Sequence, residues 1–256
     1  MDRTTLYQRV AHGYYNKVED MLQQDRSRVN EIEKTRYFNQ TPLQVAINKV
    51  NVRMVRILLA YGANPNMLTE AGDTPLSEVV TSVCYDQDPN RKYGDDPRRQ
   101  EPAINIALLL IQHGVDIEMR CTELQETPLI SSVNGGFFEL TNILLYHGAK
   151  INTRDGVGRT ALMWAAFQGS ERDVALLVQH GADISIEGLD GLNAEQLAFQ
   201  KEDQGESFGE ISANLRDRRL NMEKFDAFAM IHREEEQQSL VHLLSTDVIE
   251  KIREYA

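Results

Sequence analysis

The chain has 256 residues and a net charge of −12, from 27 Lys and Arg against 39 Asp and Glu. Hydrophobic residues make up 41% of it and charged residues 26%, which is typical of a folded globular protein and excludes disorder throughout. The acidic excess repels phosphate backbones, so the sequence predicts no nucleic-acid partner and favours a partner protein with a basic surface.

The start of the chain and its cysteines indicate a cytoplasmic protein. Residues Met1 to Thr5 lead into no apolar segment, so no secretory signal is predicted. Apolar runs such as Ile106 to Ile111 are far shorter than the roughly 20 residues that span a bilayer, so we expect no membrane association. Cys84 and Cys121 lack a CxxC spacing and predict neither a disulfide framework nor a zinc site. We expect no metal and no cofactor.

A Thr-Pro-Leu motif recurs along the chain. It begins at Thr41, Thr74 and Thr127, and Thr160-Ala161-Leu162 is a variant of it. The first two and the last two copies lie 33 residues apart, whereas the middle two lie 53 apart, which is one period plus a 20-residue insertion. Thr can cap a helix, and Pro at the first helical position lacks only an N–H that would be unpaired anyway. Each copy therefore predicts the start of a helix.

A glycine motif keeps the same period and predicts the end of a second helix in each unit, because Gly accepts the left-handed conformation. Two independent motifs with one period are typical of a solenoid, in which a single unit cannot bury its apolar face alone. The copies are Tyr61-Gly62-Ala63-Asn64, His113-Gly114-Val115-Asp116, His147-Gly148-Ala149-Lys150 and His180-Gly181-Ala182-Asp183.

These motifs resemble the ankyrin-repeat family, most closely from Gly158 to Asp183, although Ala161 replaces the usual Pro and Lys150 the usual Asp or Asn. The resemblance covers roughly residues 5 to 200 and implies six units, of which the first lacks the Thr-Pro-Leu motif and the sixth keeps only its first helix recognisably. It implies an all-α solenoid of stacked helix-turn-helix units, with short β-hairpin loops and a concave groove formed by the hairpin tips and the inner helices.

Two segments depart from the repeat pattern. An insertion within residues 81–102 interrupts the third unit between its helices, and its Asp and Pro content predicts a solvated loop, either disordered or in contact with a partner. We expect residues 1–201 to form the repeat domain and residues 202–256 to form helices that cap the stack, with Leu215, Met222, Phe225, Phe228 and Ile231 spaced for one apolar face.

The end of the tail leaves an alternative open. Leu244 to Ile252 resembles, faintly, the opening of F-box-type elements, which recruit ubiquitin ligases. Ser245 stands where those elements usually carry Pro, and only four residues follow Ile252. The tail therefore either caps the stack, recruits such an enzyme, or carries an unrecognised activity.

Three histidines recur just before the helix-ending glycines, at His113, His147 and His180. Neighbouring helices pack about 8–10 Å apart, whereas each ligand of a zinc ion lies about 2 Å from it. A role at the helix C-terminus is therefore favoured over a metal ladder. No P-loop, HExxH or GxSxG is present, and the sequence predicts that the chain is not an enzyme.

The resemblance implies a monomeric adaptor, or an effector that an intracellular microbe delivers into its host cell, which binds a partner protein through the groove. For Trp164, the one tryptophan, packing and recognition remain equally open. Tyr37 and Phe38 are groove contacts unless the first unit covers them. The positions that match the family's binding residues are Tyr37, Phe38, Gln40, Gln44, Glu70, Asp73, Ser77, Glu123, Gln125, Ile130, Arg154, Asp155, Arg159, Trp164, Phe167, Glu187, Leu189 and Asp190.

Overall fold

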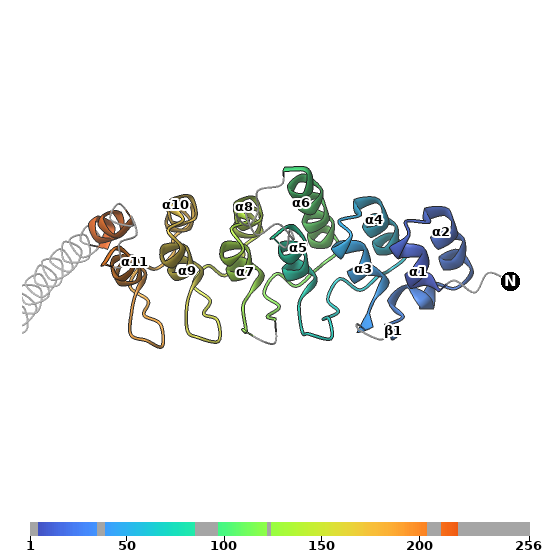
Figure 1. The fold of residues 1–256 in the computed structure, drawn as a ribbon, viewed down its shortest axis with the longest axis horizontal. Coiled ribbons are helices and arrows are strands. Elements are labelled where there is room, and N and C mark those ends of the chain that lie inside the picture. Colours follow the sequence, from blue (N-terminus) through green and yellow to red (C-terminus); the bar gives the residue numbers. More distant parts are fainter. Residues whose placement is uncertain (1–4, 35–38, 85–96, 122–123, 204–210, 220–256) are drawn as a thin grey trace, which may run out of the picture.

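Helices stack in pairs along one axis, with loops projecting from one side of the stack (Figure 1). The computed structural model describes residues 5–34, 39–84, 97–121, 124–203 and 211–219. The inner row, next to the projecting loops, consists of α1 (Leu6–Ala11), α3 (Pro42–Asn48), α5 (Pro75–Cys84), α7 (Pro128–Asn134), α9 (Ala161–Gln168) and α11 (Ala194–Asp203). The outer row consists of α2 (Tyr15–Gln24), α4 (Val52–Ala60), α6 (Pro97–Gln112), α8 (Phe138–Tyr146) and α10 (Glu171–Gln179).

Each inner helix from α1 to α9 packs against the next one, and α4, α6, α8 and α10 pack in the same succession. The short 3₁₀-helix η1 (Arg26–Asn30) follows α2. Strands β1 (Glu33–Lys34) and β2 (Asn39–Gln40) pair antiparallel, with Glu33 opposite Gln40. The predicted all-α stack of helix pairs is confirmed.

The threonines of the repeated motif cap the inner helices as predicted. The Thr41 side chain accepts a hydrogen bond from the backbone N–H of Gln44, and the Gln44 side chain accepts one in return from the N–H of Thr41. Thr127 and Thr160 accept from Ile130 and Met163 in the same way. Thr5 caps α1 through the same reciprocal pattern with Gln8, although the first unit has no Thr-Pro-Leu. Such caps satisfy N–H groups that a helix cannot pair internally.

A ladder of side-chain hydrogen bonds joins the loops that follow the outer helices. The Asn30 side chain accepts from Asn64 N at 2.8 Å and donates to Gly62 O at 3.3 Å. Asn66 bonds to the next loop likewise, accepting from Asp116 N at 2.7 Å and donating to Gly114 O at 3.2 Å. These bonds fix the spacing of neighbouring units, and the second set does so across 50 residues of chain.

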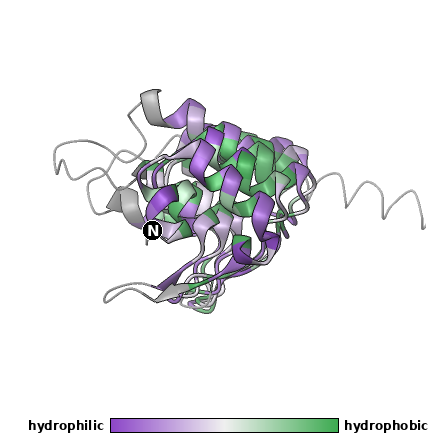
Figure 2. Ribbon diagram, turned by 90° about the vertical axis from the view of Figure 1, so that its right-hand side faces the viewer, coloured by the Kyte–Doolittle hydropathy of each residue, from purple (hydrophilic) through white to green (hydrophobic). Residues whose placement is uncertain are grey.

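The core runs the length of the stack without interruption. In a view along the stack, hydrophobic residues lie on the packed helices and hydrophilic ones along the projecting loops (Figure 2). Phe137, at the N-cap of α8, is the largest of the completely buried side chains, and small residues such as Ala165 and Ala166 bring neighbouring helices close. One shared core suits a solenoid, whose units are stabilised by their neighbours.

The helices extend into both ends of the segment that we expected to be a loop. α5 continues to Cys84, and α6 begins at Pro97. The polar residues near the end of α5 fit a helix because Thr81 and Ser82 donate hydroxyl hydrogen bonds to the carbonyls of Ser77 and Val79. The remainder of the predicted insertion, residues 85–96, lies outside the described residues.

Residues 211–219 form a helix that packs against α10 and α11, roughly in line with the outer row (Figure 1). Ile211 and Leu215 are buried in the shared core, and Arg216 and Arg219 bond to Glu195 of α11. The segment thus stands where the second helix of a sixth unit would stand. The proposed division of the chain at residue 201 stays a prediction, and residues 220–256 lie outside the described part.

Candidate protein-binding surface

The projecting loops form a row of parallel fingers beside the inner helices (Figure 1). We name each finger after the inner helix that follows it: the α5 finger (residues 63–74), the α7 finger (residues 115–127), the α9 finger (residues 149–160) and the α11 finger (residues 182–193). These fingers carry most of the residues that the family resemblance assigns to binding.

A buried aspartate organises the α9 finger. One carboxylate oxygen of Asp155 accepts hydrogen bonds from Val157 N at 3.0 Å and Arg159 N at 2.8 Å. The other oxygen accepts from Trp164 Nε1 at 2.7 Å. Because charge-assisted hydrogen bonds are the strong ones, Asp155 fixes both the turn and the orientation of the indole on α9.

An arginine lies over the aromatic side chains of α9. The guanidinium of Arg159 is 5.0 Å from the ring centroid of Trp164 and 4.9 Å from that of Phe167, and the two rings meet edge to face at 5.9 Å. Arg159 also pairs with Asp190 of the α11 finger at 3.3 Å. This partly exposed ion pair adds little stability, but it helps to orient the arginine. The result is an ordered aromatic and cationic platform beside the fingers.

Neighbouring fingers are also tied to each other. Arg120 donates to Arg154 O at 2.7 Å, and Gly156 N donates to Leu124 O at 2.8 Å. At Gly158, which has a φ of +80°, an added Cβ would lie 2.7 Å from Leu189 Cγ, so the position excludes larger residues. These contacts join the α7, α9 and α11 fingers into one surface.

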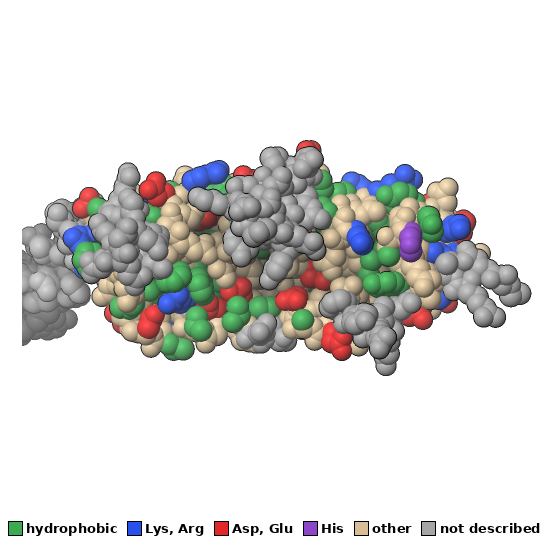
Figure 3. Space-filling view, viewed as in Figure 1, with side chains coloured by type: hydrophobic (Ala, Val, Ile, Leu, Met, Phe, Trp, Pro, Cys, Tyr) green, Lys and Arg blue, Asp and Glu red, His purple; other side chains and the backbone are tan. Residues whose placement is uncertain are grey.

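Exposed apolar side chains line this surface at nearly the same place on successive fingers. Leu124 is 50% exposed, Val157 49% and Leu189 78%. Figure 3 shows hydrophobic and acidic side chains gathered along the edge that the fingers form. A row of exposed apolar residues edged by polar ones is typical of a protein-interaction site.

The structure places the predicted contact residues in different environments. Gln44, Ser77 and Ile130 are buried. The first two complete helix caps and Ile130 lies in the core, so these side chains are enclosed by the protein itself. Gln40, Asp73, Arg159, Trp164 and Phe167 are half-buried, Asp155 is buried, and the exposed ones are Glu70, Gln125, Arg154, Glu187, Leu189 and Asp190.

The remaining predicted residues, Tyr37, Phe38 and Glu123, lie outside the described residues. The exposed Leu124 and Val157 are not among the positions that the family resemblance assigns, although both stand three residues before the capping threonine of their unit.

Burial raises the pKa of three carboxyl groups that lie close to the inner and outer helices. Burial raises the pKa of Glu78 to about 8, with a further contribution from Asp73, and one Glu78 oxygen has no hydrogen-bond partner. Burial also raises the pKa of Glu126, against hydrogen bonds from Ser131 and Asn134. The same cause raises the pKa of Asp173, which accepts a hydrogen bond from Ser170. Burial is the first cause in all three cases, because removal from water disfavours the charged form of a carboxyl.

Within the described ranges, no three His, Cys, Asp or Glu side chains gather closely enough to hold a metal ion. Over the same part of the chain, none of the helices combines the length and the apolar composition that crossing a membrane requires. His113 bonds through Nδ1 to Leu109 O at 2.8 Å, as expected of a histidine that satisfies a helix C-terminus.

Comparison with known proteins shows which family this chain resembles. Ankyrin repeats (3 copies) match residues 100–187, and ankyrin repeats (many copies) match residues 26–78. The B-cell lymphoma 3 protein homolog of Mus musculus is 28% identical over 174 residues, which are 61% of this chain and 39% of the relative. A putative ankyrin repeat protein of Rickettsia bellii is 26% identical over 147 residues, which are 57% of this chain and 49% of the relative. The chain thus spans half or less of the length of these curated relatives.

Two solved structures share the fold. An ankyrin repeat domain from Acinetobacter baumannii superposes with a TM-score of 0.66 at 22% identity, covering 82% of this chain and 95% of that one. A chain from the complex of a predatory endopeptidase of Bdellovibrio bacteriovorus with an immunity protein superposes with a TM-score of 0.61 at 22% identity, covering 80% and 95%. The stacked helix pairs, the fingers and the family matches together show that the chain belongs to the ankyrin-repeat family.

Proposed function

We propose that the chain is a non-enzymatic adaptor that binds a partner protein across the α7, α9 and α11 fingers and the exposed side of α9. Ankyrin repeat domains generally mediate protein binding, which supports this class of function. The observation that carries the proposal is the ordered platform of Trp164, Phe167 and Arg159 beside the exposed Leu124, Val157 and Leu189. Clustered aromatic and arginine side chains at the centre of a contact surface often carry most of the binding energy.

The chemistry of the surface describes the partner. Apolar partner side chains would cover the finger tips, and basic ones would meet the exposed Glu187 and Asp190. The net charge of −12 adds a long-range attraction for such a partner. The same proposal holds that the chain is a monomer and acts in the cytoplasm, either as an adaptor or as a microbial effector. The F-box-like segment from Leu244 to Ile252 lies outside the described residues.

Leu189→Ser tests the finger tips. Leu189 is 78% exposed, so the change should leave the thermal midpoint unaltered and weaken partner binding about tenfold, the effect of losing roughly 1.4 kcal/mol. The partner would first be recovered by affinity capture and mass spectrometry, and its affinity then measured by titration calorimetry. Tyr146→Ser is the matched control, because Tyr146 is 83% exposed on the outer helix α8. Equal losses from both variants would contradict a site on the fingers.

Trp164 can be tested by a pair of substitutions that separate its ring from its N–H group. Trp164→Ala removes the platform and should weaken binding by about 2 kcal/mol or more, while circular dichroism remains that of the folded chain. Trp164→Phe keeps an aromatic ring but removes the donor to Asp155 and part of the ring surface, so a smaller loss is expected. Unchanged affinity in a folded Trp164→Ala variant would remove this residue from the site.

A further inference from the structure

Glu78 is a buried carboxyl group on the side of α5 that corresponds to the platform on α9. It stands four residues after the capping Thr74, which is the register that Trp164 occupies after Thr160. Glu78 is 4% exposed, and its Oε2 atom has no hydrogen-bond partner among the described residues. In that part of the chain Asp173 has a similar oxygen, but it lies on the outer helix α10. A buried oxygen without a donor costs free energy, so its presence on the inner row requires an explanation.

The carboxyl group of Glu78 lies just beneath the surface of the inner row. Its other oxygen accepts a hydrogen bond from Asn48 Nδ2 of α3 at 3.4 Å, which is a long bond, and Asn48 is exposed. Thr81, one turn further along α5, is exposed as well. Burial and the charge of the half-buried Asp73, on the α5 finger, both raise the pKa of Glu78. A donor that displaced Asn48 would therefore reach two neighbouring carboxyl groups.

A second buried carboxyl group beside the inner row is fully bonded. Glu126 stands one residue before the capping Thr127. One of its oxygens accepts a hydrogen bond from Ser131 at 3.0 Å, and the other accepts one from Asn134 at 3.1 Å. Hydrogen bonds within the chain thus satisfy both oxygens of Glu126, whereas they satisfy one of the two at Glu78.

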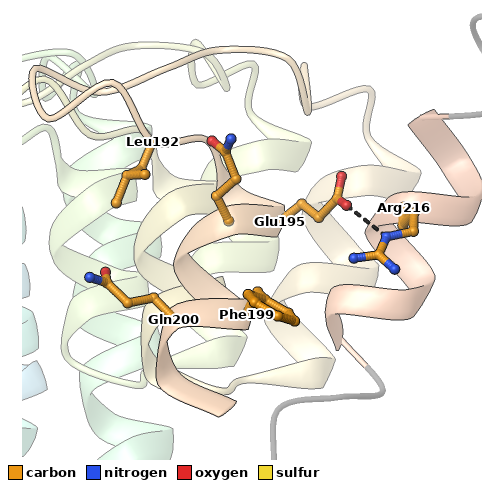
Figure 4. Close-up of a pocket in the computed structure, with 6 residues that line it drawn as sticks. Leu192, Glu195, Phe199, Gln200 and Arg216 are labelled. Carbon is orange, nitrogen blue, oxygen red and sulfur yellow. Dashed lines mark hydrogen bonds and ion pairs between the residues drawn. The ribbon is translucent and has the colours of Figure 1, made fainter. Parts of the chain in front are cut away.

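Glu195 of α11 shows how the chain compensates a carboxylate with cationic side chains. It accepts hydrogen bonds from Arg216 at 3.0 Å and from Arg219 at 2.9 Å, and the first of these is drawn in Figure 4. In the described part of the chain, no arginine or lysine is among the causes that shift the pKa of Glu78. Glu78 therefore lacks the counter-charge that Glu195 has.

We propose that Glu78 receives an arginine side chain of the partner protein, with Asp73 as a second acceptor. A guanidinium group carries several N–H donors and is more weakly hydrated than an ammonium group, so it suits a pair of carboxyls that is removed from water. It would supply both the missing donor to Oε2 and the opposite charge. This site rests on the proposed function, because it names a side chain of the partner, and it extends the contact surface to the α5 finger.

A titration with N-acetylarginine amide, followed by the amide NMR signals of α5 in the full-length chain, tests the site directly. N-acetylcitrulline amide is the matched probe, since it has nearly the same shape and no charge. The arginine compound should bind with a dissociation constant on the order of 1 mM, and at least about tenfold more tightly than the citrulline compound.

Substitutions locate the bound arginine compound. Glu78→Gln should weaken its binding at least about tenfold, because the charge is lost while the size of the side chain is kept. Glu171→Gln is the matched control and should leave the affinity unchanged. Glu171 also lies in the first turn of its helix, but it is exposed on the outer helix α10.

The pH dependence separates Glu78 from ordinary surface carboxylates. Its pKa is about 8, and a cation binds the charged form, so the affinity should rise roughly twentyfold from pH 6 to pH 7.5. Asp73 acts on Glu78 from the α5 finger, and Lys49, Glu101 and Glu126 are charged residues in or next to the helices that pack against α5. Because the pKa of Glu126 is raised too, the test is that Glu78→Gln removes this rise.

Equal binding of the two probes, no binding at millimolar concentrations, or an unchanged affinity in Glu78→Gln would overturn the proposal. None of these results bears on the finger tips, which are tested by the effect of Leu189→Ser on the recovered partner. Arginine binding that Glu78→Gln abolishes, in a chain whose partner affinity Leu189→Ser leaves unaltered, would support this site and contradict the finger surface.

Discussion

Glu78→Gln is expected to stabilise the protein at neutral pH. It should also remove most of the decrease in the free energy of unfolding that the wild type shows as the pH rises. Glu78 is only 4% exposed, one of its carboxyl oxygens has no hydrogen-bond partner, and its pKa is raised from 4.5 to about 8. Burial is the main cause, and Asp73 adds to it, whereas the hydrogen bond from Asn48 opposes it. Gln keeps the size of the side chain and an acceptor for Asn48 but carries no charge.

The sign of this pH dependence follows from the number of protons that the folded and the unfolded protein bind. Between pH 4.5 and 8 the folded protein holds a proton on Glu78 that the unfolded chain has lost. The free energy of unfolding therefore falls as the pH rises through this range, by up to about 1.4 kcal/mol for each pH unit. At pH 7 the wild type should be up to about 3 kcal/mol less stable than it would be without this shift.

Urea denaturation at pH 5 and at pH 7.5 measures the effect. The wild type should lose stability between these two values, and Glu78→Gln should lose much less. Glu187→Gln is the control, because Glu187 is exposed and its substitution removes the same charge from the chain. A wild-type protein that is equally stable at both pH values, once the Glu187→Gln response is subtracted, would show that Glu78 does not titrate in this way.

Phe137→Ala is expected to be the most destabilising single substitution in the middle of the stack. The Phe137 side chain is completely buried at the N-cap of α8, and truncation of a buried aromatic residue costs about 3–5 kcal/mol. The cavity would lie in the fourth unit, with packed helices on both sides. Because each unit depends on its neighbours, the loss should also make unfolding less cooperative.

Guanidinium denaturation followed by circular dichroism should show a lower midpoint and a broader or two-step transition. Tyr146→Ala is the control, since it removes an aromatic side chain from the same helix at a position that is 83% exposed. A Phe137→Ala midpoint as high as that of Tyr146→Ala would mean that the neighbouring units repack into the space.

The repeated elements could be predicted because their causes are local. Thr41 and Thr127 cap helices through residues three positions away, and Gly148 ends a helix through its own φ of +87°. These interactions recur in the sequence with the period of the fold. The helix pairs and their order therefore followed from the residues, whereas the projecting loops were implied by the resemblance to the ankyrin-repeat family.

The details of the surface depend on contacts that spacing does not reveal. Gln44 matches a binding position of the family, but it donates to Met67 O of the next finger and completes a buried cap. Asp155 also matches a binding position of the family, whereas its carboxylate is enclosed by the turn and by Trp164. The role of Glu195 could not be predicted, because its two arginines come from a segment more than 20 residues later.

The asparagine ladder has a consequence for how the length of the chain can change. Asn66 reaches Asp116 N at 2.7 Å although 50 residues separate them, which is the bond geometry found between units of ordinary length. The pitch of the array is thus set by the loops that follow the outer helices, whereas the extra length of chain joins α5 to α6. A foreign peptide or a fluorescent label spliced between residues 85 and 96 should therefore leave the α7, α9 and α11 fingers undisturbed, so this junction is suited to attaching a reporter.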